Sequence, residues 1–209
     1  MQAKPRITFW FEFGSTYSYL SACRIEALAE QAGVDVEWRP FLLGPIFTDR
    51  GWNTSPFNVY PDKGIYMWRD MGRRAAMHAL PLRKPASFPQ NGLLASRVVL
   101  VGLDEGWGAA FAKAVYRAEF VQDQPIADAG ALAPLIEQVG GNARAVLARS
   151  SAEAIKSRLR RLVDEAKQHG LFGAPSFMCQ GELFWGDDRL EEALLWCCGS
   201  HPAQSMADP

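Results

Sequence analysis

Apolar and polar residues near the N-terminus follow first a strand pattern and then a helix pattern. Residues 7–13 are mostly β-branched and aromatic, which is typical of a buried strand. After Gly14, apolar residues recur at helical spacing, and we expect that helix to end near Gly33. Residues 34–41 alternate apolar and polar side chains up to a proline, which predicts a second strand. Strand, helix and strand together predict a βαβ unit, whose crossover is right-handed.

The middle of the chain shows no strand pattern. Residues 42–61 are rich in Gly, Pro and Asn and have no periodicity, which predicts a long loop. Long loops inside compact domains are more often functional than idle. From residue 63 to residue 167 the apolar positions fall at helical spacing almost throughout. The predicted helices begin at Lys63 and then cover residues 93–103, 107–120, 128–139, 143–148 and 151–169.

Strand patterns return near the C-terminus. Residues 173–179 and 182–185, joined by a Gln-Gly pair, predict a β-hairpin. We expect Asp187 or Asp188 to cap a final helix over residues 190–198. The order of elements is therefore β-α-β, a helical block and then α-β-β-α. This order favours a single α/β sheet with an all-helical insertion over two domains in tandem.

The composition indicates a protein that folds alone and binds a small molecule. Its 209 residues are 48% hydrophobic, which is enough to bury a large core. The formal net charge is −1 and no basic run occurs, which argues against nucleic acid and anionic membranes as main partners. The N-terminal apolar run is short and contains Glu12, and no stretch approaches the roughly 20 apolar residues of a membrane span. We therefore expect a soluble, cytoplasmic protein.

The cysteines and histidines show no paired spacing. No C-x-x-C sequence occurs and the three histidines are scattered, so we predict no bound metal. Cys197 and Cys198 lie in an apolar helical run, and we expect them to be reduced core thiols. The other two cysteines are Cys23 and Cys179.

Ser15 stands at the turn between the first strand and the first helix. A hydroxyl there lies beside the unpaired N–H groups of the first helical turn, where partial positive charge stabilises an oxyanion or a thiolate. The alternative is that Ser15 is an N-cap, worth about 1 kcal/mol, and nothing more. This stretch by itself leaves both interpretations open.

Several segments, in the same order along the chain, resemble the kappa-class glutathione transferases and, within them, the 2-hydroxychromene-2-carboxylate isomerases. Thr16 departs from the pattern, since these enzymes usually have proline there, but threonine also tolerates a helix start. The resemblance implies an α/β, thioredoxin-like fold of the DsbA type with an all-helical insertion domain. Residues 1–62 and 168–209 would form the thioredoxin-like domain, and residues 63–167 the insertion with its return helix. The resembling segments are residues 13–19, 38–44, 53, 63–67, 170–175 and 185–190.

The resemblance implies that Ser15 donates a hydrogen bond to the thiolate of bound glutathione. Such a bond, together with the helix N-terminus, lowers the pKa of the thiol. Thioredoxin-like disulfide exchangers carry a cysteine pair at this turn, because exchange needs a thiolate and a resolving partner. Ser15 and Ser18 hold those places here, and Cys23 lies about two turns into the helix. We therefore expect no disulfide oxidoreductase activity.

Other glutathione contacts are implied around the hairpin. Pro175 precedes an apolar strand, and we expect a cis peptide bond between Ala174 and Pro175, with an ordinary edge-strand proline as the alternative. In the resembling families the residue before the cis-proline offers its backbone to the peptide part of glutathione. The resemblance also places the γ-glutamyl end against Asp187 and Asp188, where a carboxylate could pair with the ammonium while another acts as a cap.

Lys63 and Asn53 resemble positions that reach glutathione or the substrate carboxylate, with a solvated lysine and a turn asparagine as the alternatives. We expect residues 41–61 and the first insertion helix to close over Ser15 from the opposite side, so that interdomain motion gates entry. The residues that we expect to take part are Trp52, Asn53, Lys63 and Met67.

The resemblance implies a glutathione-dependent isomerase that converts 2-hydroxychromene-2-carboxylate to trans-o-hydroxybenzylidenepyruvate in the breakdown of naphthalene-type aromatics. The thiolate would add to the opened substrate and leave again, so glutathione acts as a cofactor. A kappa-class-like transferase or peroxidase is the alternative, and a non-catalytic glutathione- or peptide-binding module is a third. The implied partners are a small aromatic carboxylate and a second copy of the chain in a homodimer.

Overall fold

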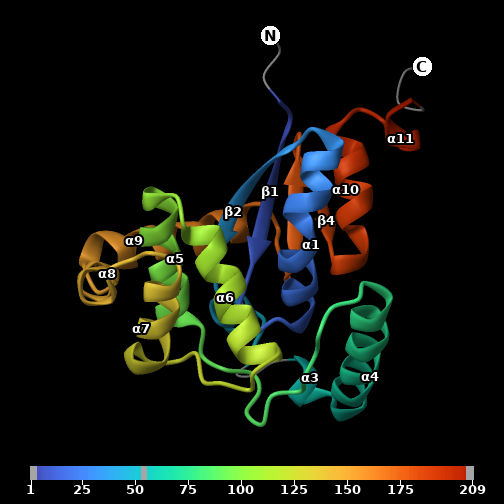
Figure 1. Cartoon of the computed structure of the whole chain (residues 1–209). Helices are drawn as coiled ribbons and strands as arrows, with labels where there is room; N and C mark the ends of the chain where they lie inside the picture. The colour runs from blue at the N-terminus through green and yellow to red at the C-terminus, as the bar shows by residue number, and fades with distance from the viewer. Residues whose placement is uncertain (1–3, 53–55, 206–209) are drawn as a thin grey trace.

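A four-stranded mixed sheet forms the centre of the molecule in the computed structural model, which describes residues 4–52 and 56–205 (Figure 1). The strand order is β2-β1-β3-β4, with β1 parallel to β2 and antiparallel to β3, and with β3 antiparallel to β4. The strands are β1 (Arg6–Phe11), β2 (Asp35–Pro40), β3 (Ser176–Cys179) and β4 (Glu182–Trp185).

The predicted βαβ unit is confirmed. Helix α1 (Thr16–Ala32) ends at Gly33, whose left-handed backbone (φ 69°) lets its N–H reach the last helical carbonyls. The parallel register places Phe9 opposite Trp38, and the Phe9 ring also stacks on Phe177 of β3 at 5.5 Å between centroids. Side chains of β1 are buried on both faces, because Phe9 and Phe11 pack in one apolar cluster with α1 and Trp10 packs on the other face with α2 (Leu43–Asp49) and α9 (Glu153–Gln168), as the apolar sequence of a buried strand predicted.

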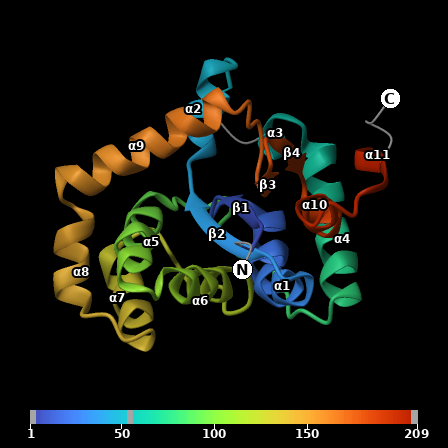
Figure 2. The ribbon, with the colours of Figure 1, turned by 90° about the horizontal axis from the view of Figure 1, so that it is seen from above.

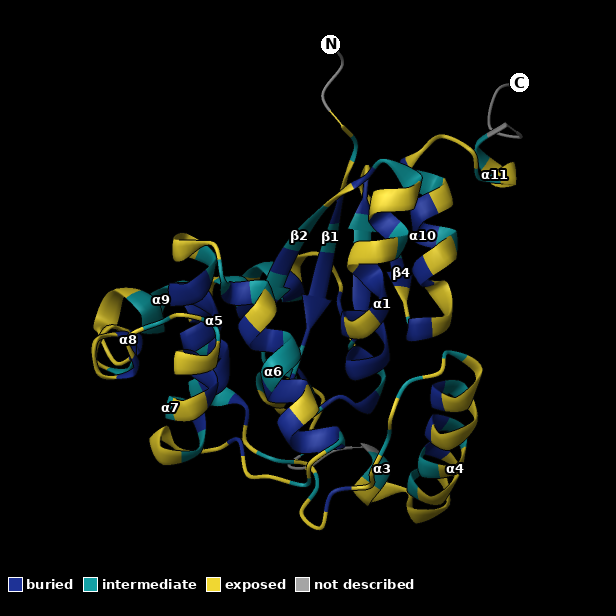
Figure 3. Ribbon diagram, in the orientation of Figure 1, coloured by how far each residue is buried: buried dark blue, intermediate teal, exposed yellow. Residues whose placement is uncertain are grey.

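The helical block between β2 and β3 is also confirmed, and its helices pack in two places. Figures 1 and 2 show α5 to α8 gathered beside the β2 edge of the sheet and α9 running back from them to α2, while α4 lies apart against α1. The buried faces of these helices turn toward the sheet and toward each other (Figure 3). The division into two domains stays a prediction. The helices are α4 (Pro61–Met77), α5 (Leu93–Glu105), α6 (Gly108–Phe120), α7 (Ala129–Gln138), α8 (Ala143–Ser150) and α9 (Glu153–Gln168).

The long loop predicted for residues 42–61 is wrong in part, because the segment contains α2 (Leu43–Asp49) and α3 (Pro56–Val59). Ile46 of α2 is buried in a second apolar cluster that also holds Trp10 and Leu171. A single buried apolar residue produces no visible periodicity, so tertiary burial rather than local pattern makes this segment helical.

The predicted hairpin is confirmed, and its two-residue turn has positive φ at Gln180 (53°) and Gly181 (86°). Positive φ at both positions suits the twist of a tight hairpin. Helix α10 (Leu190–Cys197) packs on β3, and α11 (Pro202–Ser205) follows it. Within residues 4–52 and 56–205, no helix is both long enough and apolar enough to cross a membrane.

The prediction that Cys197 and Cys198 are reduced core thiols is wrong for Cys197, which is oxidised, and wrong in part for Cys198, which is reduced but exposed. Cys197 is joined to Cys179 in a disulfide, with 5.6 Å between the Cα atoms, whereas Cys198 is a free, exposed thiol and Cys23 is likewise free and exposed. Cys179 ends β3 and Cys197 ends α10, so the packing of α10 on β3 brings them together. The spacing of 18 residues carries no signal of this proximity.

Candidate functional site

Ser15 connects the start of α1 to the loop before β3. Its Oγ accepts a hydrogen bond from the Ser18 N–H at 3.3 Å, so Ser15 is an N-cap, which was one of its two interpretations from sequence. The same hydroxyl donates to the carbonyl oxygen of Ala174 at 2.7 Å, and Ser15 is only 8% exposed. A serine hydroxyl has one proton. Donation to a bound thiolate therefore requires the Ser15 hydroxyl to turn away from Ala174.

The peptide bond between Ala174 and Pro175 is cis, as predicted. The Pro175 carbonyl accepts from the Gly186 N–H at 3.0 Å, which ties this loop to the end of β4. Gly186 has φ 113° and ψ 149°, a backbone conformation that only glycine adopts without strain. The structure thus brings Ser15, the cis-proline loop and the segment after Gly186 together.

The predicted capping role of Asp187 and Asp188 is wrong. These residues belong to a short 3-10 helix, η1 (Asp187–Arg189). The N-cap residue of η1 is Gly186 and that of α10 is Arg189, and neither helix has a side-chain capping bond at its N-terminus in the described structure. The Asp187 side chain turns inward and is 1% exposed.

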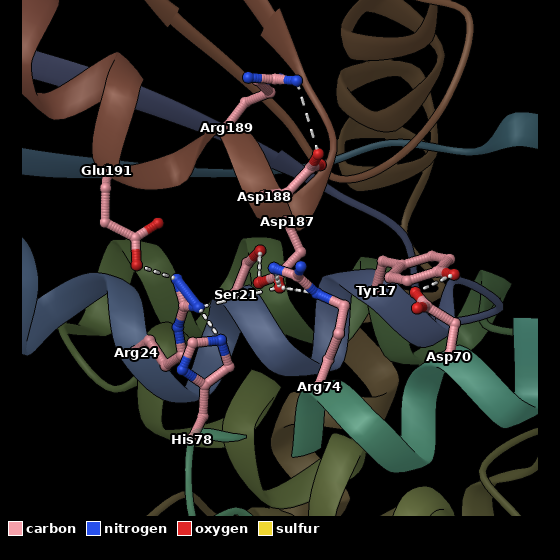
Figure 4. Close-up of polar contacts among 10 residues, drawn as sticks. All are labelled: Tyr17, Ser21, Arg24, Asp70, Arg74, His78, Asp187, Asp188, Arg189 and Glu191. Atoms are coloured by element: carbon pink, nitrogen blue, oxygen red, sulfur yellow. Dashed lines mark hydrogen bonds and ion pairs between the residues drawn. The ribbon is translucent and has the colours of Figure 1, made fainter. Parts of the chain in front are cut away.

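Asp187 is the centre of a polar cluster that joins three segments (Figure 4). Its Oδ1 accepts from Ser21 Oγ at 2.9 Å, and its Oδ2 accepts from Arg74 Nε at 2.9 Å. Arg24 lies 3.8 Å from the same carboxylate, with only 9% of its side chain exposed. We call Ser21, Arg24, Arg74, His78, Asp187 and Glu191 the Asp187 cluster. It connects α1, α4 and the η1–α10 segment.

The rim of the Asp187 cluster supplies partners for both terminal nitrogens of Arg24, whereas Arg24 Nε has none within the described residues. Its Nη2 donates to Glu191 Oε1 at 2.8 Å, and its Nη1 lies 2.5 Å from His78 Nε2. Burial and the Arg24 guanidinium lower the pKa of His78, so its ring is neutral and Nε2 accepts this bond. Sequence analysis missed Arg24, Arg74 and His78, because isolated charges on a helix have the same pattern as a solvated face.

Asp188 differs from Asp187 in being accessible. Its side chain is 56% exposed, and its carboxylate lies 3.7 Å from the Arg189 guanidinium. Of the two predicted partners for a ligand ammonium, Asp187 is therefore already held by Arg74, while Asp188 keeps a carboxylate that a ligand can reach.

Lys63 and Met67 of α4 line a cavity of about 370 Å³ with Tyr17 of α1. Tyr17 lies two residues after Ser15, although Ser15 itself does not line the cavity. The exposed Lys63 has its Nζ 4.7 Å from the centre of the Tyr60 ring. The Trp52 ring packs on Phe47 of α2, with 5.8 Å between the ring centres, and Asn53 lies outside the described residues. The gating motion stays a prediction.

Two neighbouring acids, the half-buried Glu12 before the Ser15 turn and the fully buried Glu119 of α6, were not singled out as site residues by sequence analysis. Burial raises the pKa of Glu12 to about 7 and that of Glu119 on α6 to about 9. Both carboxylate oxygens of Glu119 lack a hydrogen-bond partner within the described chain. The Glu12 carbonyl accepts from the Tyr116 hydroxyl at 2.9 Å and from the Ser15 N–H at 3.1 Å. The turn that presents Ser15 is thus anchored to α6.

Comparison with known proteins identifies the same fold. The family profile described as "DSBA-like thioredoxin domain" matches residues 6–194. A 2-hydroxychromene-2-carboxylate isomerase of Sphingobium xenophagum is 32% identical over 187 residues, covering 88% of this chain and 94% of the relative. A solved 2-hydroxychromene-2-carboxylate isomerase structure aligns with a TM-score of 0.82 and 26% identity, covering 93% of this chain and 96% of the other.

A more distant relative, glutathione S-transferase kappa 1 of Rattus norvegicus, is 23% identical over 209 residues, covering 91% of this chain and 90% of the relative. The isomerase matches extend over nearly the whole length of both partners. This chain therefore belongs to the 2-hydroxychromene-2-carboxylate isomerase family of enzymes, within the larger family of proteins with a DSBA-like thioredoxin domain.

Proposed function

We propose that the protein is a glutathione-dependent isomerase that converts 2-hydroxychromene-2-carboxylate to trans-o-hydroxybenzylidenepyruvate in the catabolism of naphthalene-type aromatics. The observation that carries the proposal is the position of Ser15, which caps α1 and contacts the residue before a cis-proline. A serine there can activate a thiol supplied by a ligand but cannot exchange a disulfide itself. A cytoplasmic location and a homodimer belong to the same proposal.

The residues around Ser15 fit glutathione by the chemistry of their groups. A thiolate suits the Ser15 hydroxyl and the partial positive charge of the α1 N-terminus. The peptide part suits the backbone of Ala174 next to the cis-proline. The γ-glutamyl ammonium suits the accessible carboxylate of Asp188, because the carboxylate of Asp187 is already bonded to Arg74.

When bound, glutathione would supply a thiolate that adds to the conjugated carbon of the opened substrate and leaves after rotation about the bond that has become single. The chain's own residues hold and orient the reactants. Ser15 stabilises the negative sulfur, and Lys63 pairs with the substrate carboxylate, assisted by Asn53. The aromatic walls of the cavity orient a flat substrate and exclude water.

The test is the absorbance change of 2-hydroxychromene-2-carboxylate with and without glutathione, for the unaltered chain and for Ser15→Ala. We expect turnover that needs glutathione without consuming it, and a loss of at least about tenfold in Ser15→Ala, as for removal of one charge-assisted hydrogen bond. Asn142→Ala is the matched control, since Asn142 caps α8 through Ala145 N–H at 3.0 Å and also loses about 1 kcal/mol. Unchanged turnover in Ser15→Ala would show that Ser15 does not activate the thiol.

A kappa-class-like transferase or peroxidase is the second candidate, favoured by the similarity to the rat kappa transferase over 91% of this chain. The stoichiometry of glutathione separates the two functions. Consumption of one glutathione per halonitrobenzene, or of two per peroxide, with no turnover of the chromene, would establish this candidate and reject the isomerase.

A further inference from the structure

Polar contacts that lie in one row hold α4 beside α1 (Figure 4). The members on α4, Asp70, Arg74 and the C-cap residue His78, are four residues apart and so share one face of the helix. Their partners come from α1 and, in the middle of the row, from η1. We call the following contacts the polar row: Tyr17–Asp70 at 2.9 Å, Asp187–Arg74 at 2.9 Å and Arg24–His78 at 2.5 Å.

The order of these contacts relates the row to the proposed site. Along α1 the row begins with Tyr17, and along α4 it begins with Asp70, so both helices pass along it in the same direction. Ser15 lies two residues before Tyr17. Lys63 lies seven residues before Asp70, which is about 10 Å at 1.5 Å per residue. Of the three contacts, Tyr17–Asp70 is therefore the nearest along the chain to both Ser15 and Lys63.

Apolar packing constrains the two halves of α4 unequally. The cavity of about 370 Å³ lies between α1 and the first two turns of α4, where Lys63 and Met67 line it. A cavity along one side of a helix removes van der Waals contacts that would otherwise fix its position. Helix α3 is joined to α4 through one residue, so it does not tie this half to α1. Farther along α4, Met71 and Ala75 are buried in the core. The first half therefore depends more on its polar contact.

The Tyr17–Asp70 bond is directional and charge-assisted. Tyr17 Oη donates to Asp70 Oδ2, and Oδ1 of the same carboxylate lies 3.0 Å from the Arg73 guanidinium. Burial, followed by the bond to Asp70, raises the pKa of Tyr17 above its ordinary value, so the phenol keeps the proton that it donates. Hydrogen bonds to an ionised group are shorter and stronger than neutral ones. Such a bond fixes a distance and a direction between two helices, which apolar contact does not.

We propose that Asp70 is a positioning residue, whose bond to Tyr17 holds the first half of α4, and Lys63 with it, in place relative to Ser15. The inference rests on the proposed function for the roles of Ser15 and Lys63, one at the thiolate and the other at the substrate carboxylate. It adds the contact that sets the separation of these two groups. A misplacement of about 1 Å, caused far from the reacting atoms, can cost about 100-fold in rate.

The first test is hydrogen exchange of the backbone amides, measured by mass spectrometry without any ligand. In Tyr17→Phe we expect exchange to be about 3- to 10-fold faster in residues 65–70, the range for one net hydrogen bond, and unchanged in residues 71–77. Asp70→Ala should give the same result. Asp70→Asn keeps an oxygen acceptor for the phenol and should restore the slow exchange.

The second test is turnover of the chromene with glutathione. Tyr17→Phe and Asp70→Ala should each lower kcat about 3- to 10-fold while the KM for glutathione stays within about twofold, and the double variant should lose no more than either single one. Asp70→Asn should recover the lost turnover. Tyr19→Phe is the matched control, because it removes another α1 hydroxyl, one that donates to the Pro81 carbonyl outside α4. Its turnover should match that of the unaltered chain.

The proposal is overturned if residues 65–70 exchange equally fast in Tyr17→Phe and Tyr19→Phe, or if Asp70→Asn exchanges as fast as Asp70→Ala. An equal loss of turnover in Tyr17→Phe and Tyr19→Phe would also overturn it, because a loss of that kind is merely structural. If the unaltered chain does not convert the chromene, the proposed function fails by itself. The exchange results, which need no substrate, then still decide whether the Tyr17–Asp70 bond holds α4.

Discussion

Removal of the Asp187 carboxylate tests whether the Asp187 cluster holds α4 against the rest of the fold. In Asp187→Ala, the Arg24 and Arg74 side chains lose their common anion, and Ser21 loses its acceptor. Breaking a buried ion pair by removing one partner costs about 3–5 kcal/mol, because an uncompensated charge stays buried.

The structure places the cost at the lower end of that range. Arg74 is 22% exposed and can turn toward water. Arg24 is almost buried but keeps its bond to Glu191. We therefore expect a loss of about 3 kcal/mol in the free energy of unfolding. For a chain of this size that corresponds to a fall in Tm of about 6–12 °C, at about 2–4 °C per kcal/mol.

The assay is urea unfolding followed by circular dichroism, with Arg74→Met and the double variant completing a cycle. Arg74→Met should cost less, about 1–2 kcal/mol, because Asp187 keeps Ser21 and Arg24, and the coupling energy should exceed 0.5 kcal/mol. Asp188→Ala removes the neighbouring exposed carboxylate and should stay within about 0.5 kcal/mol of the unaltered chain. The reasoning is refuted if Asp187→Ala costs no more than this control.

Three further results are expected. The pKa of Glu119 is about 9 in the fold and about 4.5 in the unfolded chain, so its contribution to stability is complete below pH 4.5 and is lost as the pH rises toward 9. In urea unfolding at pH 5.5, 7 and 8.5, the free energy of unfolding should therefore fall by the order of 1 kcal/mol per pH unit, and Glu119→Gln should make this fall less steep. The same slope in Glu119→Gln and in the unaltered chain would contradict this prediction. Asp188→Ala should raise the KM for glutathione about 3- to 10-fold with little change in kcat, since a partly exposed ion pair between Asp188 and the glutathione ammonium contributes to binding rather than to chemistry. Steady-state kinetics that show an unchanged KM would exclude the contact between Asp188 and glutathione. Gly186→Ala should lower stability by about 1–3 kcal/mol because of its φ of 113°, whereas Gly44→Ala, in open space on α2, should leave Tm equal or higher.

The sequence by itself determined the elements whose signal is local. The period of apolar residues predicted α1 and the strands on either side of it, and a two-residue Gln-Gly turn predicted the hairpin. An N-cap was one of the two interpretations of Ser15, and the bond before Pro175 was predicted as cis; both features are found. These features depend on contacts within a few residues, or on the chemistry of one residue type, so they are visible in the printed order of amino acids.

The tertiary structure alone decided which distant residues meet. Asp187 was predicted as a helix cap or a ligand contact, yet it turns inward because Arg74, 113 positions earlier, and Ser21 lie there. Cys179 and Cys197 are joined because α10 packs on β3, although Cys197 was expected to be a reduced thiol. A charge or a thiol carries no record in its own sequence neighbourhood of the partner that packing brings to it. Such pairings follow from how the helices pack on the sheet, and that packing depends on the whole buried core at once.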